Sequence, residues 1–214
     1  MEKIWIIGAG QFGLRAAKWL MKQRRSVEIL MVDLDAAFLA EAEQLGCRIE
    51  MRDGVKFLFD NLNVEHSPDW VIPAVPVHLA SEWCRLHIGE AFMRSMELPA
   101  KIKEGLPNAM DGPSGDIYVS HADFICPPNC NEPDERCTQT GRPRKPDMFE
   151  LLAQIRFQDI KPFVIQSEQL GPGVGGYRPN ALFELKKQLE VYRGPCFTAT
   201  ACRCHGVISG SLRR

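Results

Sequence analysis

The sequence IWIIGAGQFG at residues 4–13 decides the fold of the first part of the chain. The apolar residues 4–7 predict a β-strand, which runs directly into the G-x-G-x-x-G pattern of Gly8, Gly10 and Gly13. Glycines at these places allow a tight turn, the approach of a phosphate to the backbone, and close packing of a helix on the sheet. The next residues have helical spacing, so the N–H groups and the positive dipole end of that helix would face the phosphates. The stretch therefore predicts the first strand, turn and helix of a dinucleotide-binding unit.

Asp33 ends the next apolar segment, residues 27–32, and lies twenty residues after Gly13. A carboxylate at this place accepts hydrogen bonds from the hydroxyls of an adenosine ribose and repels a 2′-phosphate. We therefore expect NAD(H), rather than NADP(H), as the cofactor.

Two further predictions concern the surroundings of this nucleotide site. In the first helix, Phe12, Ala16, Trp19 and Leu20 share one face, which we expect to be buried. Asp53 precedes a third helix and has two compatible interpretations. It caps that helix, or it lies at the carboxyl end of a third strand, beside the adenine side of a dinucleotide.

The composition limits the partners of the chain. The 214 residues contain 26 basic and 27 acidic side chains, for a formal charge of -1, so no general field attracts nucleic acid or membrane lipids. The start of the chain lacks the features of a signal peptide, and no apolar run reaches the length of a transmembrane helix. We expect a cytoplasmic protein that is not embedded in a membrane and does not bind nucleic acid. A homodimer is compatible with the apolar edges of such a small unit.

A longer pattern extends the glycine motif. It comprises Val32-Asp33-x-Asp35, Leu45-Gly46, Arg52-Asp53-Gly54 and Asp69-x-Val71-Ile72-x-Ala74-Val75-Pro76. With it, residues 1–90 resemble the NAD-binding domain of the Trk/RCK potassium-transport regulators, which typically have Gly-Asp where this chain has Arg52-Asp53. The resemblance implies a Rossmann half that binds NAD(H) or another adenine nucleotide, with Asp33 at the ribose, and a peripheral partnership with a membrane transporter. The cofactor-binding candidates are Gly8, Gly10, Gln11, Phe12, Gly13, Asp33, Asp53, Ala74 and Val75.

The order of the expected elements predicts an α/β fold. We expect a doubly wound, mostly parallel, Rossmann-like sheet with a cysteine-rich loop insertion and a C-terminal α/β segment. Residues 1–95 would form the dinucleotide-binding half. The Pro and Gly residues of 96–116 favour a linker or loop, and residues 117–214 would form a second α/β half with a metal site.

Eight cysteines in a reducing compartment point to metal or redox chemistry rather than to structural disulfides. One group lies in a loop rich in Pro, Asn and Asp, and a second group lies near the end of the chain. The metal-ligand candidates are Cys126, Cys130, Cys137, Cys202 and Cys204. Thiolates of this kind suit zinc or an iron–sulfur cluster.

Other interpretations of the cysteines stay open. The candidates could be free or incidentally packed thiols, because their spacing matches neither zinc ribbons nor bacterial ferredoxins. Cys47 and Cys84 are predicted to be packed thiols. A strand over residues 195–209 would carry Cys202 and Cys204 on one face.

Three weaker signals remain. His121 is a secondary ligand candidate, and the basic residues around Arg144 are expected on a solvated surface. A glycine-rich stretch between a strand and a helix could bind the phosphate or carboxylate of a small anionic substrate, or serve as a lid or connector. The residues of this candidate anion loop are Gly173, Gly175 and Gly176.

These patterns support three hypotheses about function. The first is an NAD(H)-dependent oxidoreductase with a cysteine-held metal or iron–sulfur site. The second is a regulatory, nucleotide-sensing subunit of a potassium transporter, as the Trk/RCK resemblance implies. The third is a structural or assembly protein that uses zinc for folding. No catalytic acid or base can be assigned from the sequence.

Overall fold

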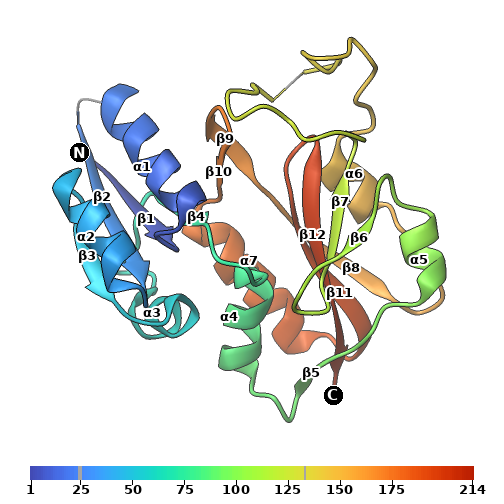
Figure 1. Cartoon of the computed structure of the whole chain (residues 1–214). Coiled ribbons are helices and arrows are strands. Elements are labelled where there is room, and N and C mark those ends of the chain that lie inside the picture. The colour runs from blue at the N-terminus through green and yellow to red at the C-terminus, as the bar shows by residue number, and fades with distance from the viewer. Residues whose placement is uncertain (24–25, 133) are drawn as a thin grey trace. The chain divides into compact units, whose positions relative to one another are not determined.

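A computed structural model describes residues 1–23, 26–132 and 134–214 of the chain (Figure 1). The chain forms two compact units. Unit 1 comprises Met1–Val75 and Glu168–Ala181, and unit 2 comprises Pro76–Ser167 and Leu182–Arg214. Unit 1 therefore takes a second, short segment from a distant part of the sequence.

Unit 1 is built on a parallel sheet in the order β3-β2-β1-β4. Its strands are β1 (Glu2–Ile7), β2 (Val27–Asp33), β3 (Arg48–Met51) and β4 (Trp70–Pro73). The connecting helices are α1 (Gln11–Gln23), α2 (Ala36–Gln44) and α3 (Gly54–Asn61). This order is that of a Rossmann-like half, and it confirms the predicted α/β fold class with a mostly parallel sheet.

The two faces of this sheet carry different helices. Ile4 and Ile6 of β1 lie in one apolar core with residues of α1 and α2. Trp5 points to the opposite face, because side chains alternate along a strand, and it meets Phe57 of α3 edge to face at 5.1 Å between ring centroids. Helices therefore lie on both sides of the sheet, as in a doubly wound fold.

The second segment of unit 1 forms a hairpin at the edge of this sheet. Strands β9 (Glu168–Gly171) and β10 (Val174–Gly176) pair antiparallel, and Tyr177 and Val71 of β4 exchange backbone hydrogen bonds of 3.0 Å. β4 is the edge strand of the sheet, and its outer backbone N–H and C=O groups would be unpaired without the hairpin, which covers this edge. Helix α7 (Pro179–Val191) then begins in unit 1 and continues into unit 2.

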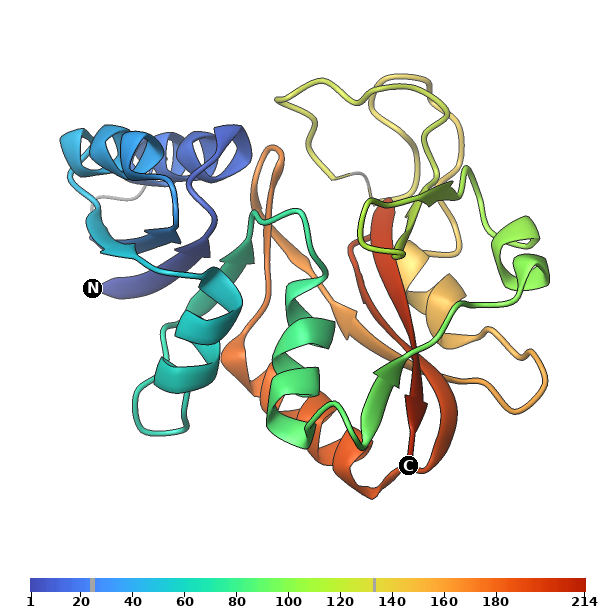
Figure 2. The same ribbon diagram turned by 60° about the horizontal axis from the view of Figure 1, so that its bottom comes forward.

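Unit 2 contains a mixed sheet in the order β6-β7-β12-β11-β8, with β5 also paired to β12 (Figure 2). Only β11 and β8 pair in parallel, and the other pairs are antiparallel. Its strands are β5 (Met93–Ser95), β6 (Met110–Asp111), β7 (Ile117–Ser120), β8 (Lys161–Gln166), β11 (Gly194–Ala201) and β12 (His205–Arg213). Its helices are α4 (Leu79–Ile88), α5 (Ala100–Glu104) and α6 (Met148–Ala153), together with most of α7.

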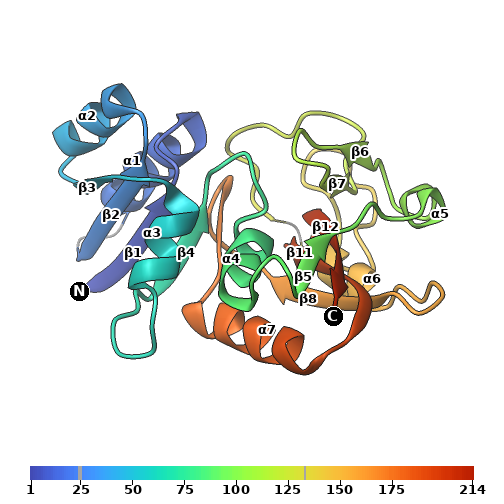
Figure 3. The same cartoon turned by 90° about the horizontal axis from the view of Figure 1, so that it is seen from below.

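Helices cover the strands of unit 2 in two groups. Met148 and Leu152 of α6 share an apolar core with Phe197 of β11. The helices α4 and α7 run side by side (Figure 3), and Trp83 meets Phe183 at 6.1 Å between ring centroids.

Three predictions of local structure are wrong. Residues 195–209 form not one strand but the hairpin of β11 and β12, so Cys202 and Cys204 lie in its turn. Residues 96–116 contain α5 and β6 in addition to loops. The predicted buried face of α1 is wrong at Phe12, which is 67% exposed, whereas Ala16 and Leu20 are buried as predicted, together with Leu14 and Ala17. In the described parts of the chain, no helix is long and apolar enough to cross a membrane.

Candidate functional site

The turn between β1 and α1 requires glycine at two of the three glycine positions of the G-x-G-x-x-G pattern. Gly8 has φ +109°, and a Cβ atom there would lie 2.4 Å from the carbonyl oxygen of Ala74. A Cβ atom on Gly13 would lie 1.9 Å from the carbonyl oxygen of Gly8. Both contacts are far below van der Waals separation, so these glycines let the turn, helix α1 and the end of β4 approach one another.

Gly10 has a different surrounding. A Cβ atom on this residue would meet no atom within 4 Å. Gly10 directly precedes helix α1, whose first N–H groups have no partner within the helix. The space beside Gly10 is therefore where a pyrophosphate could reach backbone N–H groups and the positive end of the helix dipole.

The carboxylate of Asp33 lies at the same edge of the sheet. The backbone N–H of Ala9 donates to Asp33 Oδ2 at 2.5 Å, and the N–H of Asp35 donates to Oδ1 at 2.9 Å. These bonds fix the carboxylate beside the glycine turn at the end of β2. Asp35 itself caps α2 by accepting from the N–H of Ala37.

The other nucleotide candidates lie at the neighbouring strand ends. Asp53 accepts from the N–H of Lys56 at 2.8 Å, so its capping role is confirmed, and its adenine-side role stays a prediction. Ala74 follows β4, and its N–H donates to the carbonyl of Ile7 at 2.7 Å. Val75 is the next residue. The remaining candidates are Gln11 and Phe12, both exposed at the start of α1.

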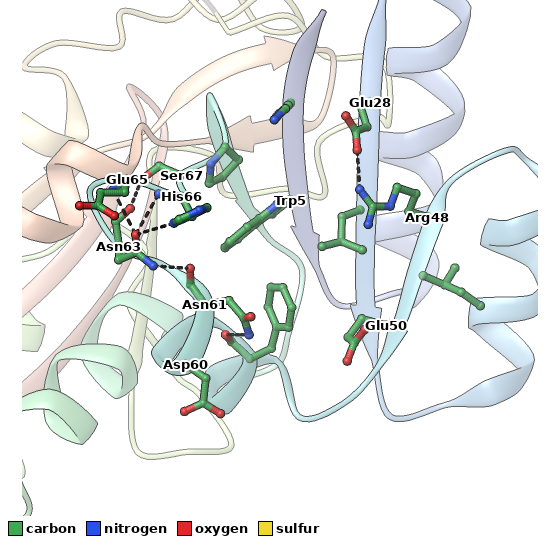
Figure 4. Close-up of a pocket in the computed structure, with 15 residues that line it drawn as sticks. Trp5, Glu28, Arg48, Glu50, Asp60, Asn61, Asn63, Glu65, His66 and Ser67 are labelled. Carbon is green, nitrogen blue, oxygen red and sulfur yellow. Dashed lines mark hydrogen bonds and ion pairs between the residues drawn. The ribbon is translucent and has the colours of Figure 1, made fainter.

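A hollow of about 550 Å³ lies elsewhere in unit 1, on the sheet face of Trp5 (Figure 4). Its wall includes Trp5 and Phe57, with Glu28 and Arg48 paired across β2 and β3 at 2.7 Å. It shares no residue with the glycine turn or with Asp33. The hollow is therefore separate from the candidate nucleotide site, and the sequence did not indicate it.

The candidate anion loop is part of the hairpin of unit 1. Gly173 has φ +68° at its turn, and Gly175 and Gly176 belong to β10. A Cβ atom on the nearby Gly171 would lie 2.5 Å from the indole of Trp19, so glycine is needed there for packing on α1. The anion-binding role of this stretch stays a prediction.

Unit 2 brings the two groups of cysteines together. The Sγ atom of Cys126 lies 3.7 Å from Nε2 of His205, and the Sγ atom of Cys202 lies 3.9 Å from Nδ1 of the same ring. Among the described residues, however, no three His, Cys, Asp or Glu side chains are arranged to hold a metal ion. His121 lies next to this group, because its N–H donates to the carbonyl of Cys204 at 2.9 Å.

The thiols of this group have different electrostatic surroundings. Burial raises the pKa of Cys126, and the charges of Cys130 and Cys137 raise it further. Burial opposes ionisation of Cys137 too, but hydrogen bonds from Thr140, from backbone N–H groups and from Arg144 lower the pKa of this thiol to about 6. The pKa of Cys126 is therefore raised and that of Cys137 lowered, so Cys137 is the thiol that ionises more easily of these two.

Arg144 corrects the prediction of a solvated basic surface. It is only 5% exposed, and its guanidinium donates to the carbonyl of His121 at 2.6 Å. The prediction of packed thiols is confirmed for Cys47 and Cys84, which are both buried.

A buried polar chain in unit 2 has no signal in the sequence. His78 is only 4% exposed. Its Nδ1 atom lies 2.7 Å from Ser209 Oγ, and its Nε2 atom lies 2.6 Å from Thr200 Oγ1. Ser209 in turn donates to Asp116. Asp116 and Ser209 both line a second hollow of about 530 Å³. Only the folded sheet brings these four residues together.

Two solved structures are similar to part of the chain. One is the WlbA dehydrogenase from Chromobacterium violaceum in complex with NADH and UDP-GlcNAcA, with 20% identity and a TM-score of 0.32 over 41% of this chain and 24% of the neighbour. The other is the saccharopine dehydrogenase (L-Glu forming) from Saccharomyces cerevisiae, with 17% identity and a TM-score of 0.31 over 41% of this chain and 20% of the neighbour. The chain thus spans less than a quarter of either enzyme.

Sequence comparison gives much longer matches. A protein of Archaeoglobus fulgidus described as "Uncharacterized protein" is 30% identical over 224 aligned residues, which cover 97% of this chain and 98% of the relative. Residues 78–214 match the model of a family described as "AF_1314_C: Uncharacterized protein, C-terminal domain". This match begins close to the start of unit 2 at Pro76. The chain therefore belongs to the AF_1314_C family, whose domain corresponds to its residues 78–214.

Proposed function

We propose that unit 1 binds NAD(H) at the glycine turn and that the chain is an oxidoreductase using this cofactor. The observation that carries the proposal is the meeting of two features at one edge of the sheet. Gly10 borders open space at the start of α1, and the carboxylate of Asp33 lies beside the same turn. The first feature suits a pyrophosphate and the second suits a ribose with free hydroxyls.

Asp33→Asn should weaken NADH binding about tenfold or more, because a hydrogen bond to a charged acceptor contributes about 1.5–3 kcal/mol. The Asn oxygen can still accept from the N–H of Ala9, but its NH2 group cannot accept from the N–H of Asp35, so the free energy of unfolding of the variant is measured beside its affinity. Affinity for NADPH should fall much less, because the repulsion of its 2′-phosphate is also removed. Fluorescence titration of both nucleotides measures the two effects.

The matched control is Asp60→Asn. This change removes a more exposed negative charge from α3 in the same unit, where Asp60 pairs with Arg52. NADH affinity should not change in this variant. Equal weakening by both variants would contradict a specific role for Asp33 at the ribose.

The thiols of unit 2 supply the second element of the proposed function. A cysteine-held metal or iron–sulfur centre would polarise a substrate or accept electrons from the nicotinamide. The substrate we expect is small and anionic, on the basis of the glycine-rich stretch at Gly173–Gly176.

The second candidate function is a regulatory nucleotide sensor, favoured by the resemblance of residues 1–90 to the Trk/RCK domains. The two functions predict different fates for NADH. We would add NADH and ferricyanide to protein purified without oxygen. Each ferricyanide ion accepts one electron, so two ions are reduced for every NADH that is oxidised to NAD. Consumption that Asp33→Asn slows would support the oxidoreductase. Binding without consumption would contradict electron transfer from NADH through the cysteines and favour the sensor, and absence of binding would leave a zinc-stabilised structural protein.

A further inference from the structure

The segment between β7 and α6, residues 121–147, needs a stabilising element that its own packing does not supply. Apart from one isolated bridge between Arg136 and Pro143, its described residues form neither helix nor strand. They contribute nothing to the apolar cluster of unit 2, and Ile125 is 97% exposed. A segment of this length without secondary structure is uncommon in a compact domain unless it is functional or held by a cross-link or a metal.

The few buried side chains of this segment are not a substitute for a core. They are Ala122, Cys137 and Arg144. One is a single methyl group, one is a thiol, and one is a charged side chain whose burial is costly without hydrogen bonds. Packing alone therefore leaves most of the ordering entropy of the segment uncompensated.

The segment is held against one place, the turn between β11 and β12. The N–H of Arg203 donates to Glu132, and its guanidinium pairs with Asp134. At the start of the segment, the N–H of His121 donates to the carbonyl of Cys204. These contacts place Cys126 of the segment beside His205, which follows Cys202 and Cys204 of the turn.

The spacing between the two groups is that of ligands on one ion. With Zn–S and Zn–N bonds of about 2.3 and 2.1 Å, a sulfur and a nitrogen on a tetrahedral zinc lie about 3.6 Å apart. The Cys126 Sγ atom and the His205 Nε2 atom lie 3.7 Å apart. Cys130 lies four residues after Cys126 in the same loop, and Cys204 precedes His205 in the turn.

Hydrogen bonds hold the backbone of the turn. The N–H groups of Cys204 and His205 both donate to the Cys202 sulfur at 3.4 Å. These bonds fix the backbone of the two residues that are ligand candidates, Cys204 and His205, while Cys202 itself lies beside Nδ1 of His205 and outside the proposed ligand set. The described side chains do not yet enclose an ion, so binding requires rotation of the remaining thiols toward the Cys126–His205 pair.

We propose that Cys126, Cys130 and His205 bind one zinc ion, with Cys204 or Cys137 as the fourth ligand, and that this ion fixes residues 121–147 on the turn between β11 and β12. Zinc is preferred to a cluster because the set mixes imidazole with thiolates on a single tetrahedron. The inference goes beyond nucleotide binding and does not depend on it.

Metal content of the purified full chain tests the proposal. Elemental analysis should give about one zinc per chain for the wild type, and at least a tenfold lower content for Cys126→Ser and for His205→Ala. Cys84→Ala is the matched control, since this buried thiol lies on α4 away from the turn, and it should keep its zinc. Between Cys204→Ser and Cys137→Ser, the variant that loses zinc identifies the fourth ligand.

A second measurement covers the case in which a variant fails to fold. A chelator that removes zinc from the wild type should make residues 121–147 sensitive to trypsin at Arg136 and at Arg144, which is buried in the ordered segment, and added zinc should restore resistance. Three results would overturn the proposal: a wild type without zinc, zinc that survives both Cys126→Ser and His205→Ala, or iron with acid-labile sulfide. NADH titration of the same samples reports separately on unit 1.

Discussion

Replacing Gly13 with alanine should destabilise unit 1 by at least about 2 kcal/mol, the range expected for overpacking a close contact. The added methyl group would lie 1.9 Å from the carbonyl oxygen of Gly8, and both partners of this contact are backbone. Neither helix α1 nor the turn can move away without losing its packing on β1. Urea unfolding of the variant, followed by tryptophan fluorescence, measures the loss, because three of the four tryptophans lie in unit 1.

Gly10→Ala is the matched variant, because the same methyl group meets no atom within 4 Å there. The free energy of unfolding should change by less than about 0.5 kcal/mol, as for other unstrained surface positions. NADH affinity should nevertheless fall, because the methyl group occupies the space proposed for the pyrophosphate. A stable Gly13→Ala variant would contradict the packing argument, and unchanged NADH affinity of Gly10→Ala would contradict the nucleotide site.

The contrast between these two glycines explains why the N-terminal fold is predictable from the sequence. The turn, the helix and Asp33 are separated by few residues, so their geometry follows from local backbone rules. The face of α1 is the exception. Its register on the sheet is set by the contact of Gly13 with Gly8, which buries Leu14 and Ala17 and leaves Phe12 exposed.

Long-range pairing is what the sequence could not supply. The hairpin that begins at Glu168 completes the edge of a sheet whose strands lie in residues 1–75. No local pattern links Tyr177 to Val71, because the pairing depends on the path of the intervening chain. The same reason explains the error at residues 195–209, where a turn divides one apolar run into two antiparallel strands.

The cysteines fall between these two cases. Proline-flanked thiols in a polar loop signalled that the loop was unusual, but one partner of Cys126, the imidazole of His205, belongs to a residue 79 positions later. Arg144 was expected in solvent because charge runs usually are, yet it is buried with its guanidinium on a backbone carbonyl. The error at Arg144 arises because the fold determines which hydrogen-bond partners the residues of a loop find.

The stability of the chain should decrease on acidification in a way that His78 controls. Burial lowers the pKa of this imidazole from 6.5 to about 3. The unfolded chain therefore takes up a proton below about pH 6.5, whereas the folded chain stays neutral at His78 until about pH 3. Stability from this residue is fully present above pH 6.5 and is lost at about 1.4 kcal/mol per pH unit between these values.

Its hydrogen bonds explain why the neutral ring is retained. Ser209 donates its hydroxyl proton to Asp116, so its oxygen accepts from His78 Nδ1, and Nε2 accepts from the hydroxyl of Thr200. The tautomer follows from this network. Protonation of Nε2 would turn an acceptor into a second donor and place a charge on a buried ring.

His78→Gln isolates this contribution, because the amide offers one donor and one acceptor but does not titrate between pH 5 and 7.5. At pH 7.5 the variant should be less stable by about 1–3 kcal/mol, the cost of imperfect buried hydrogen bonds. That deficit should shrink by about 2 kcal/mol when urea unfolding is repeated at pH 5, since only the wild type then suffers the proton-linked loss.

Subtracting the free energy of unfolding of the variant from that of the wild type at each pH removes the contributions of His87, His121 and His205, which both proteins share. His66→Gln, on an exposed loop, should leave the slope of the wild type unchanged. Parallel pH profiles for wild type and His78→Gln would show that His78 is not held neutral in the folded chain.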